Sequence, residues 1–149
     1  MAVRMKDIAQ DLGVSLMTIS KALRNHPDIS EGTRKRVLKR IEELSYRPNL
    51  AARALVTGKT YLMGLVVPDL VHPFFSQIAN AISKVLREQR YSLVITSSQE
   101  DPELEQQEID QLLARSVDCL FIASTQTALE GFRRIEDQET PYILLDRKL

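Results

Sequence analysis

Apolar residues recur at helical spacing near the start of the chain. Those with the periodicity of two short helices are Ile8, Ala9, Leu12, Val14, Ile19 and Leu23. Gly13 supplies the positive φ that ends a first helix. Ser15 is placed to cap a second helix, because its hydroxyl can accept a hydrogen bond from an early backbone N–H. The pattern predicts two short helices around a tight turn, the second over about residues 16–23.

The second predicted helix has one face without a core role. This face carries Leu16, Met17, Ser20 and Lys21, at the i, i+4 spacing of one helical side. A helix with a free N-terminal face can project its first turns toward base edges in a DNA major groove. Helix pairs of this size are also ordinary structural units. A helix-turn-helix and a plain helical corner therefore both remain open.

A third helix is predicted over about residues 31–44, where Ser30 stands as a cap. Its apolar positions at helical spacing are Val37, Ile41 and Leu44. It also carries a basic run: Arg34, Lys35, Arg36, Lys39 and Arg40. Residues 46–58 follow as an Ala-rich segment that is too short to form a stable helix alone in water. That segment needs a partner, and DNA or a second copy would serve.

The rest of the chain alternates short apolar runs with helical patterns. The runs are Leu62–Val67, Leu93–Ile95, Cys119–Ala123 and Tyr142–Leu145. Three helices are expected between them. Phe75, Ile78, Ile82 and Leu86 line one face of the first, Ile109, Leu112 and Leu113 mark the second, and Ala128, Phe132 and Ile135 mark the third, which starts near Thr127. Strands that alternate with helices predict a parallel sheet covered on both faces.

Polar residues follow each predicted strand. They are Asp69, Ser97–Gln99, Ser124–Gln126 and Asp146–Arg147. Ligands of open α/β sheets bind outside the carboxyl ends of the strands, so these positions could form a crevice for a small polar molecule. Loops at this edge are also polar in proteins without such a crevice.

The formal net charge of zero hides two opposite halves. Residues 1–60 hold 12 Lys and Arg against 6 Asp and Glu, whereas residues 61–149 hold 8 against 14. A basic first part joined to an acidic remainder is typical of phosphate contact by one part only. A charge run can also be merely a solvated helix face.

Other classes of function find little support in the sequence. The histidines are His26 and His72, the one cysteine is Cys119, and no metal, phosphate-loop or dinucleotide motif is present. We therefore expect no catalytic residue, no metal site and no cofactor. We also expect a cytoplasmic protein without a membrane segment, because no signal-peptide core or apolar run of spanning length is present.

Two motifs at fixed spacing resemble those of a known family. They are V-S-x-x-T-[IV]-S at Val14–Ser20 and Y-x-P-N-x-x-A-x-x-L at Tyr46–Leu55. The whole segment from Arg4 to Leu55 resembles the DNA-binding headpiece and hinge of LacI-type (lactose-repressor-like) transcription regulators. The stretch YLMGLVVPDLVHPFFSQIANAI resembles the first strand, effector loop and first helix of the periplasmic-binding-protein-like core of that family.

The resemblance implies an all-α helix-turn-helix headpiece over residues 1–57, with a hinge helix at about 48–57. An incomplete α/β parallel-sheet subdomain follows over residues 58–149. The family core has two similar subdomains with the effector between them, and this chain stops inside the first. We therefore expect a truncated core with an exposed sheet edge and an unpaired apolar face.

DNA contacts are also implied residue by residue. Leu16 and Met17 would discriminate operator sequence, and their apolar side chains favour contact with thymine methyls. Lys21 is the candidate for a guanine contact. Further contacts with phosphates or base edges are implied for Ser15, Thr18, Ser20, Asn25, Thr33, Tyr46 and Asn49. In this family two hinges pair in the minor groove, where Leu55 would wedge into the central base step with Ala52 nearby. Otherwise Leu55 is a plain linker residue.

The same resemblance implies an effector site at Asp69, Phe74, Phe75, Ser124 and Asp146, whereas His72 could be a loop residue or a ligand contact. The effector of a full-length relative would be a sugar or a similar small polar metabolite. The resemblance thus implies a repressor that binds a near-palindromic operator in double-stranded DNA as a homodimer. The alternative is a truncated remnant that binds DNA weakly and nonspecifically, or that poisons an intact relative by pairing with it.

Overall fold

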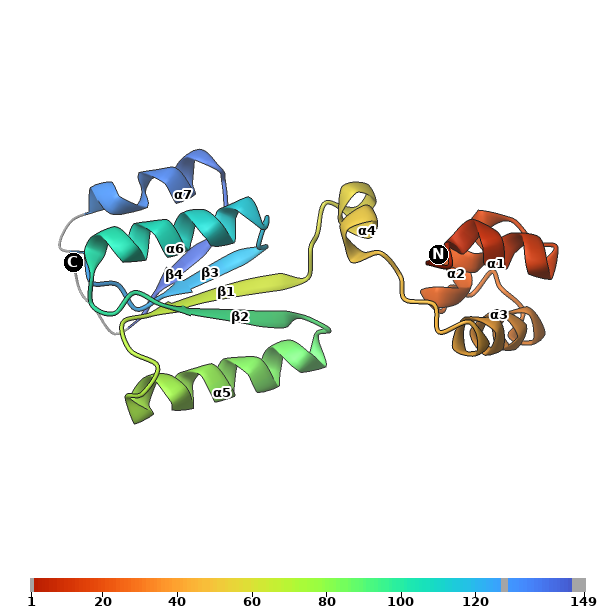
Figure 1. The fold of residues 1–149 in the computed structure, drawn as a ribbon, viewed down its shortest axis with the longest axis horizontal. Helices are drawn as coiled ribbons and strands as arrows, with labels where there is room; N and C mark the ends of the chain where they lie inside the picture. The colour runs from red at the N-terminus through yellow and green to blue at the C-terminus, as the bar shows by residue number, and fades with distance from the viewer. Residues whose placement is uncertain (1, 127–128, 146–149) are drawn as a thin grey trace. The chain divides into compact units, whose positions relative to one another are not determined.

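The first part of the structure is helical. The computed structural model describes residues 2–126 and 129–145. The chain divides into two compact units, the first ending at Arg53 and the second beginning at Ala54. The first helices in chain order are α1 (Met5–Leu12), α2 (Leu16–Leu23), α3 (Glu31–Glu43) and α4 (Leu50–Thr57) (Figure 1). The predicted helix pair and the third helix are therefore confirmed.

The core of the first unit joins α1, α2 and α3 through small and branched side chains. Its buried members are Ile8, Ala9, Ile19, Ala22 and Val37. Between α1 and α2 the chain turns at Gly13, whose φ of 64° is the left-handed conformation that glycine adopts without steric cost. The turn is closed by the Val14 N–H, which donates to the Ala9 carbonyl at 3.0 Å. The turn therefore has the chemistry that its sequence predicts.

The second unit is a four-stranded parallel sheet with the strand order β2-β1-β3-β4. The elements in chain order are β1 (Leu62–Val67), α5 (Pro73–Glu88), β2 (Ser92–Ser97), α6 (Pro102–Ala114), β3 (Cys119–Ile122), the 3₁₀ helix η1 (Leu129–Phe132), α7 (Arg133–Asp137) and β4 (Tyr142–Leu144). Helices α6 and α7 cover one face of the sheet and α5 lies on the other (Figure 1). The predicted α/β class, with a parallel sheet and helices on both faces, is confirmed.

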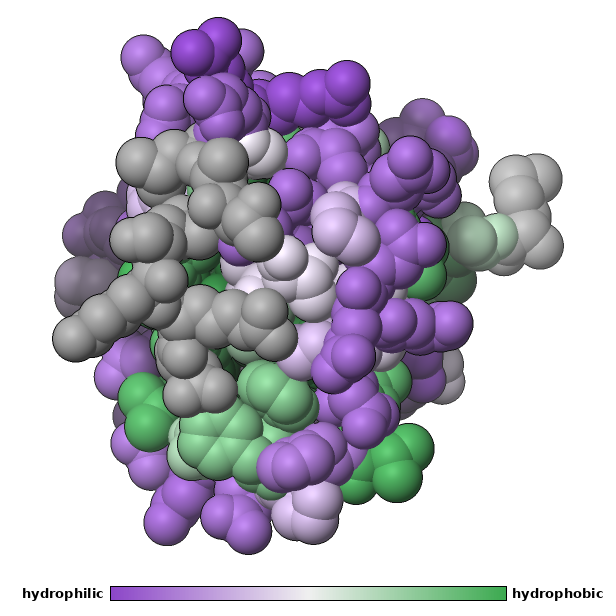
Figure 2. Space-filling view, turned by 90° about the vertical axis from the view of Figure 1, so that its left-hand side faces the viewer, coloured by the Kyte–Doolittle hydropathy of each residue, from purple (hydrophilic) through white to green (hydrophobic). Residues whose placement is uncertain are grey.

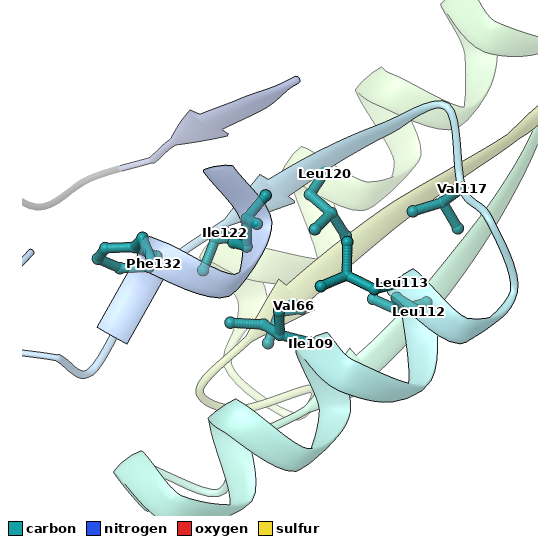
Figure 3. Close-up of a cluster of buried hydrophobic side chains, with 9 residues drawn as sticks. Val66, Ile109, Leu112, Leu113, Val117, Leu120, Ile122 and Phe132 are labelled. Atoms are coloured by element: carbon teal, nitrogen blue, oxygen red, sulfur yellow. The ribbon is translucent and has the colours of Figure 1, made fainter. Parts of the chain in front are cut away.

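The main core lies between the sheet and the helices α6 and α7 (Figure 3). It contains Val66, Ile109, Leu112, Leu113, Val117, Leu120, Ile122, Phe132 and Ile135. Gly64 of β1 sits under this layer, where a Cβ atom would lie 2.6 Å from a Leu120 methyl and 2.8 Å from a Leu112 methyl. The absence of a side chain at this position allows the helix layer to approach the sheet closely.

The opposite face of the sheet is apolar and less completely covered. Helix α5 packs against β2, and one row of paired positions crosses all four strands: Ile95, Leu65, Phe121 and Ile143. Leu65 is buried, whereas Ile143 on the edge strand β4 is 50% exposed. The unpaired apolar face expected from the sequence stays a prediction, to which the exposure of Ile143 is relevant.

The described part of the last helical segment is not one continuous helix. Thr127 and Ala128, where we expected its start, lie outside the described residues. The following residues form η1 and then the five-residue α7. Gly131 lowers helix propensity in this segment. A Cβ at position 131 would also lie 3.0 Å from the Gln126 side chain, so a larger residue has little room there.

Candidate nucleic-acid interface

The first turn of α2 is fixed by two hydroxyl side chains. Ser15 Oγ accepts a hydrogen bond from the Thr18 N–H at 3.1 Å, and the two hydroxyl oxygens lie 2.9 Å apart. This cap satisfies a backbone donor that a helix start otherwise leaves unpaired. Ser15 and Thr18 therefore have structural roles in the free chain in addition to the DNA contacts predicted for them.

Two large apolar side chains on α2 face away from the core. Leu16 is 51% exposed and Met17 is 60% exposed, while Ile19 and Ala22 of the same helix are buried. Ser20 is half-buried. Helix α2 therefore carries two large apolar side chains that the core of the first unit does not bury. The two predicted discriminator residues are therefore accessible.

The cationic end of the same helix is paired within the chain. Lys21 Nζ donates to Asp28 Oδ2 at 2.9 Å, and His26 Nδ1 lies 3.5 Å from the same carboxylate oxygen. The hydrogen bond from Lys21 and its positive charge hold the pKa of Asp28 below its usual value. Asn25, another predicted contact, is exposed and ends α2 with a φ of 56°.

Helix α3 begins with a second pair of hydroxyls. Ser30 Oγ accepts from the Thr33 N–H at 3.3 Å and donates to Thr33 Oγ1 at 2.9 Å. Thr33 is thus part of the cap of α3. Tyr46, beyond the end of this helix, is half-buried and packs against the core of the first unit.

Part of the basic run on α3 serves the fold. Arg40 donates to Asp11 Oδ2 through Nε at 3.0 Å and through Nη2 at 2.5 Å, and to Glu43 Oε2 at 3.0 Å. Arg36 Nη2 donates to the Leu12 carbonyl at 3.3 Å, beside the turn between α1 and α2. The hydrogen bonds to Asp11 and Glu43 raise the pKa of the Arg40 guanidinium. The charge pattern alone could not separate these two arginines from cations that remain available to phosphate.

Helix α4 is capped by a residue that the sequence assigned to DNA contact. Asn49 Oδ1 accepts from the N–H groups of Ala51 at 3.0 Å and Ala52 at 3.2 Å. This cap explains why α4 begins at Leu50, slightly later than the predicted start at about 48. Leu55 is 90% exposed. The predicted wedge residue of this helix is therefore accessible.

The predicted effector residues in and before α5 make their contacts with neighbours in the sequence. Asp69 Oδ1 accepts from the Val71 N–H at 2.7 Å, and the rings of Phe74 and Phe75 meet edge to face at 5.2 Å. His72 Nδ1 accepts from the Phe74 N–H at 3.2 Å, so His72 caps α5. Asp69 is half-buried, and Phe74 is among the exposed large hydrophobic residues.

At the carboxyl ends of the strands, the surface of the second unit has both hydrophobic and hydrophilic areas. Hydrophobic side chains gather in one area there and hydrophilic ones border it (Figure 2). Leu70 and Val71, in the loop after β1, are exposed beside Phe74.

Ser124 has a buried structural role. It is 2% exposed, and its hydroxyl donates to Glu105 Oε1 at 2.5 Å while accepting from the Gln126 N–H at 2.9 Å. The fully buried Glu105 also accepts from the Thr125 N–H and hydroxyl, both at 2.6 Å. The effector role predicted for Ser124 thus lacks an exposed hydroxyl. Asp146 lies outside the described residues.

Two pockets of the second unit do not include the predicted effector residues. One, of about 510 Å³, is lined near the amino-terminal ends of the strands by residues that include Gly58, Tyr91, Asp118 and Thr140. The other, of about 310 Å³, lies beside α6 and α7 around Asp110 and Arg134. Neither contains Asp69, Phe74, Phe75 or Ser124.

Metal-binding clusters and membrane-spanning helices are absent from the part of the chain that the structure describes. There, no three His, Cys, Asp or Glu side chains gather closely enough to hold a metal ion. Among the same residues, no helix has the length and the apolar run that a membrane span requires.

Known families match both units. A family model described as bacterial regulatory proteins, lacI family, matches residues 4–49. A second model, described as periplasmic binding proteins and sugar binding domain of LacI family, matches residues 60–149. Together the two models cover both the helical unit and the sheet.

Individual relatives are similar along nearly the whole chain. Catabolite control protein A of Streptococcus mutans is 37% identical over 93% of this chain, and the sucrose operon repressor of Pediococcus pentosaceus is 31% identical over all of it. A crystal structure of the lac repressor dimer bound to operator and the anti-inducer ONPF matches 98% of the chain with a TM-score of 0.82 and 27% identity. The chain spans less than half of these proteins: 41%, 45% and 45% of their lengths, respectively.

Proposed function

Because the chain belongs to the LacI family of bacterial regulatory proteins, we propose that it is a sequence-specific DNA-binding transcription regulator that acts as a repressor. It binds a near-palindromic operator in double-stranded DNA as a homodimer. Helix α2 reads the major groove, and α4 contacts the operator centre. The site of action is the cytoplasm, where the single thiol of Cys119 stays reduced.

The exposed face of α2 is the observation that carries this proposal. Leu16 and Met17 lie at the start of the helix with more than half of their surface exposed, although the helix already buries its other face. A major groove accepts a helix in this orientation, and its thymine methyls provide apolar partners. Exposed apolar residues at these two positions are better explained by base contact than by the fold of the headpiece.

The identities of the relatives support the same function. The Pediococcus relative is a sucrose operon repressor, and the lac repressor was crystallised as a dimer on its operator. The match of residues 60–149 to a sugar binding domain also supports a sugar, or a similar small polar metabolite, as the effector of a full-length relative. We propose no catalytic step for this chain.

An in vitro selection from random-sequence duplex DNA tests the proposal. The full 149-residue chain is expected to enrich a palindrome with a fixed centre, because two headpieces dock with their hinges paired. A variant that carries both Leu16→Ala and Met17→Ala serves as the matched comparison. We expect it to enrich a different or weaker sequence while retaining phosphate-driven binding.

The selection also has a result that contradicts the proposal. If the wild-type chain enriches nothing above background, it is a remnant that binds DNA weakly and nonspecifically, or that acts by pairing with an intact relative. Salt dependence alone does not separate the two functions, because phosphate contacts dominate both. The ratio of operator affinity to random-sequence affinity does.

A further inference from the structure

A short junction, residues 58–61, joins the end of α4 at Thr57 to the start of β1 at Leu62. Each of its four backbone N–H groups donates a hydrogen bond. The donors and acceptors are Gly58 to the Ala54 carbonyl at 2.8 Å, Lys59 to Thr57 Oγ1 at 3.3 Å, Thr60 to Asp118 Oδ1 at 2.9 Å and Tyr61 to Asp118 Oδ2 at 3.0 Å. A segment this short, with every N–H bonded, has little freedom to change its course.

A single carboxylate holds the second half of the junction. Asp118 lies directly before β3 and is half-buried, and hydrogen bonds to a charged acceptor are stronger than those between neutral groups. Its own N–H donates to the Leu62 carbonyl at 2.8 Å. The Thr60 hydroxyl donates to the Ser116 carbonyl at 2.8 Å, which is a second bond to the same loop. The junction is therefore attached to the loop between α6 and β3.

The junction also contains a strained residue. Tyr61 has a φ of 58°, a left-handed conformation that bulky residues rarely adopt. Such a conformation costs free energy and persists only where surrounding contacts enforce it, most often at functional sites. Besides its bond to Asp118, Tyr61 accepts from the Ser92 N–H at 2.9 Å, and its ring lies 5.2 Å from that of Tyr91. The chain thus keeps one course between α4 and β1 at a cost in free energy.

We propose that Asp118 is a positioning residue for operator binding, which acts on α4 by fixing the junction to the sheet. If the junction were loose, α4 would lose freedom of motion on entering the minor groove, and that loss would weaken binding. With the junction fixed, much of that freedom is lost before α4 meets DNA. Only a duplex whose centre accepts α4 benefits, so Asp118 increases the preference for the operator and not phosphate-driven binding. This inference rests on the proposed function.

The test compares Asp118→Asn with two controls in the full chain. Asparagine keeps one acceptor oxygen, so one of the two backbone hydrogen bonds is lost. Glu139→Gln removes the same charge from an exposed position that lines the same pocket as Asp118. Gly64→Ala crowds the core of the second unit and leaves the junction intact. Asp118→Asn is also combined with Leu55→Ala, which trims the exposed leucine of α4.

The measurements separate an effect on α4 from a loss of stability. Dissociation constants are measured at one salt concentration on the duplex selected by the wild type and on a scrambled duplex. Urea denaturation and sedimentation velocity give the stability and the association state of each variant. If Asp118→Asn does not fold, Thr60→Val takes its place, because it removes only the hydroxyl bond to Ser116, and the same pattern is expected of it.

We expect Asp118→Asn to weaken binding to the selected duplex by about five- to tenfold, and to the scrambled duplex by about twofold or less. Glu139→Gln and Gly64→Ala leave the ratio of the two affinities unchanged. In the Leu55→Ala background the effect of Asp118→Asn on the selected duplex shrinks, because α4 then gains little from being held.

Three results would overturn the inference: equal effects of Asp118→Asn on both duplexes, an undiminished effect in the Leu55→Ala background, or the same fall in the ratio in Gly64→Ala. Each of them leaves the proposed function standing if the wild type still prefers its selected duplex. A wild type that prefers no sequence overturns the proposed function, and this inference with it.

Discussion

At the residue scale, Gly64 is where one added methyl group matters most to the fold. Its missing side chain leaves room for methyls of Leu120 and Leu112 that would otherwise lie under 3 Å from a Cβ. Both leucines belong to the main core and cannot retreat freely. The position thus couples the central strand β1 to the packing of α6.

We expect Gly64→Ala to lower the free energy of unfolding by about 1–3 kcal/mol, the usual effect of overpacking a core. Urea denaturation followed by circular dichroism measures this change. Gly32→Ala is the control, because a Cβ there meets nothing within 4 Å and alanine favours helices. Equal stability of Gly64→Ala and the wild type would show that the helix layer can shift away from the sheet.

Glu105 is a second residue whose substitution has a defined consequence. Its buried carboxylate accepts hydrogen bonds from Ser124 and Thr125 and so fixes the loop after β3. Glutamine keeps one acceptor oxygen here but replaces the other with an NH2 group, so at least one of these hydrogen bonds is lost and Glu105→Gln should cost about 1–3 kcal/mol of stability. Chemical denaturation checks this value, with Glu103→Gln on the exposed side of α6 as the control. A loss no greater than that of the control would contradict the role assigned to Glu105.

Local chemistry at single residues could be predicted from the sequence, whereas pairing between distant residues could not. The turn at Gly13 and the cap at Ser15 depend on neighbours within a few positions. The hydrogen bonds of Arg40 depend on Asp11, 29 positions away. Such pairs exist only once helices have packed, so the basic run of α3 looked uniform in the sequence.

At the element scale, α4 combines a local cap with an exposed leucine. We expect Leu55→Ala to leave affinity for random DNA nearly unchanged and to lower operator preference, because a wedge contributes only where the central step opens. Binding measurements on both kinds of duplex provide the test. Leu50→Ala, which trims another exposed leucine of the same helix, is the comparison. Equal losses on operator and random DNA would exclude Leu55 as the wedge.

The bounds of elements show where sequence patterns succeed and where they fail. Helix α3 has the predicted start, because Ser30 marks it with a side-chain cap. The segment before β4 was expected as one helix, but its described part is a 3₁₀ turn followed by a short α7. Its apolar spacing is consistent with burial of Phe132 and Ile135, which does not require one continuous helix.

At the scale of the whole molecule, the incompletely covered sheet face affects behaviour in solution. Ile143 continues a row of apolar residues to the edge strand and is half exposed there. We expect concentration-dependent association of the chain without DNA, and weaker association in Ile143→Lys, because a charge at a sheet edge opposes strand pairing. Sedimentation velocity measures both, and Gln138→Lys adds the same charge at another exposed position. Association that is unchanged by Ile143→Lys would place the contact elsewhere.

The general architecture could be predicted because alternating strands and helices permit few arrangements. The effector residues could not be assembled in the same way. Asp69 and Ser124 follow strands β1 and β3 as expected, but the Ser124 hydroxyl is buried and Asp69 accepts a hydrogen bond from its own loop. Position relative to a strand end does not fix where a side chain hydrogen bonds.

The strand order has a consequence for synthesis on the ribosome. Strand β1 is central, between β2 and β3, so both of its edges are unpaired until residues 92–97 have been translated, and one edge stays unpaired until residues 119–122 follow. The helices before it contact one another over short sequence distances, and such contacts form quickly. The helical unit can therefore be complete while β1 is still an open strand that needs protection from other nascent chains.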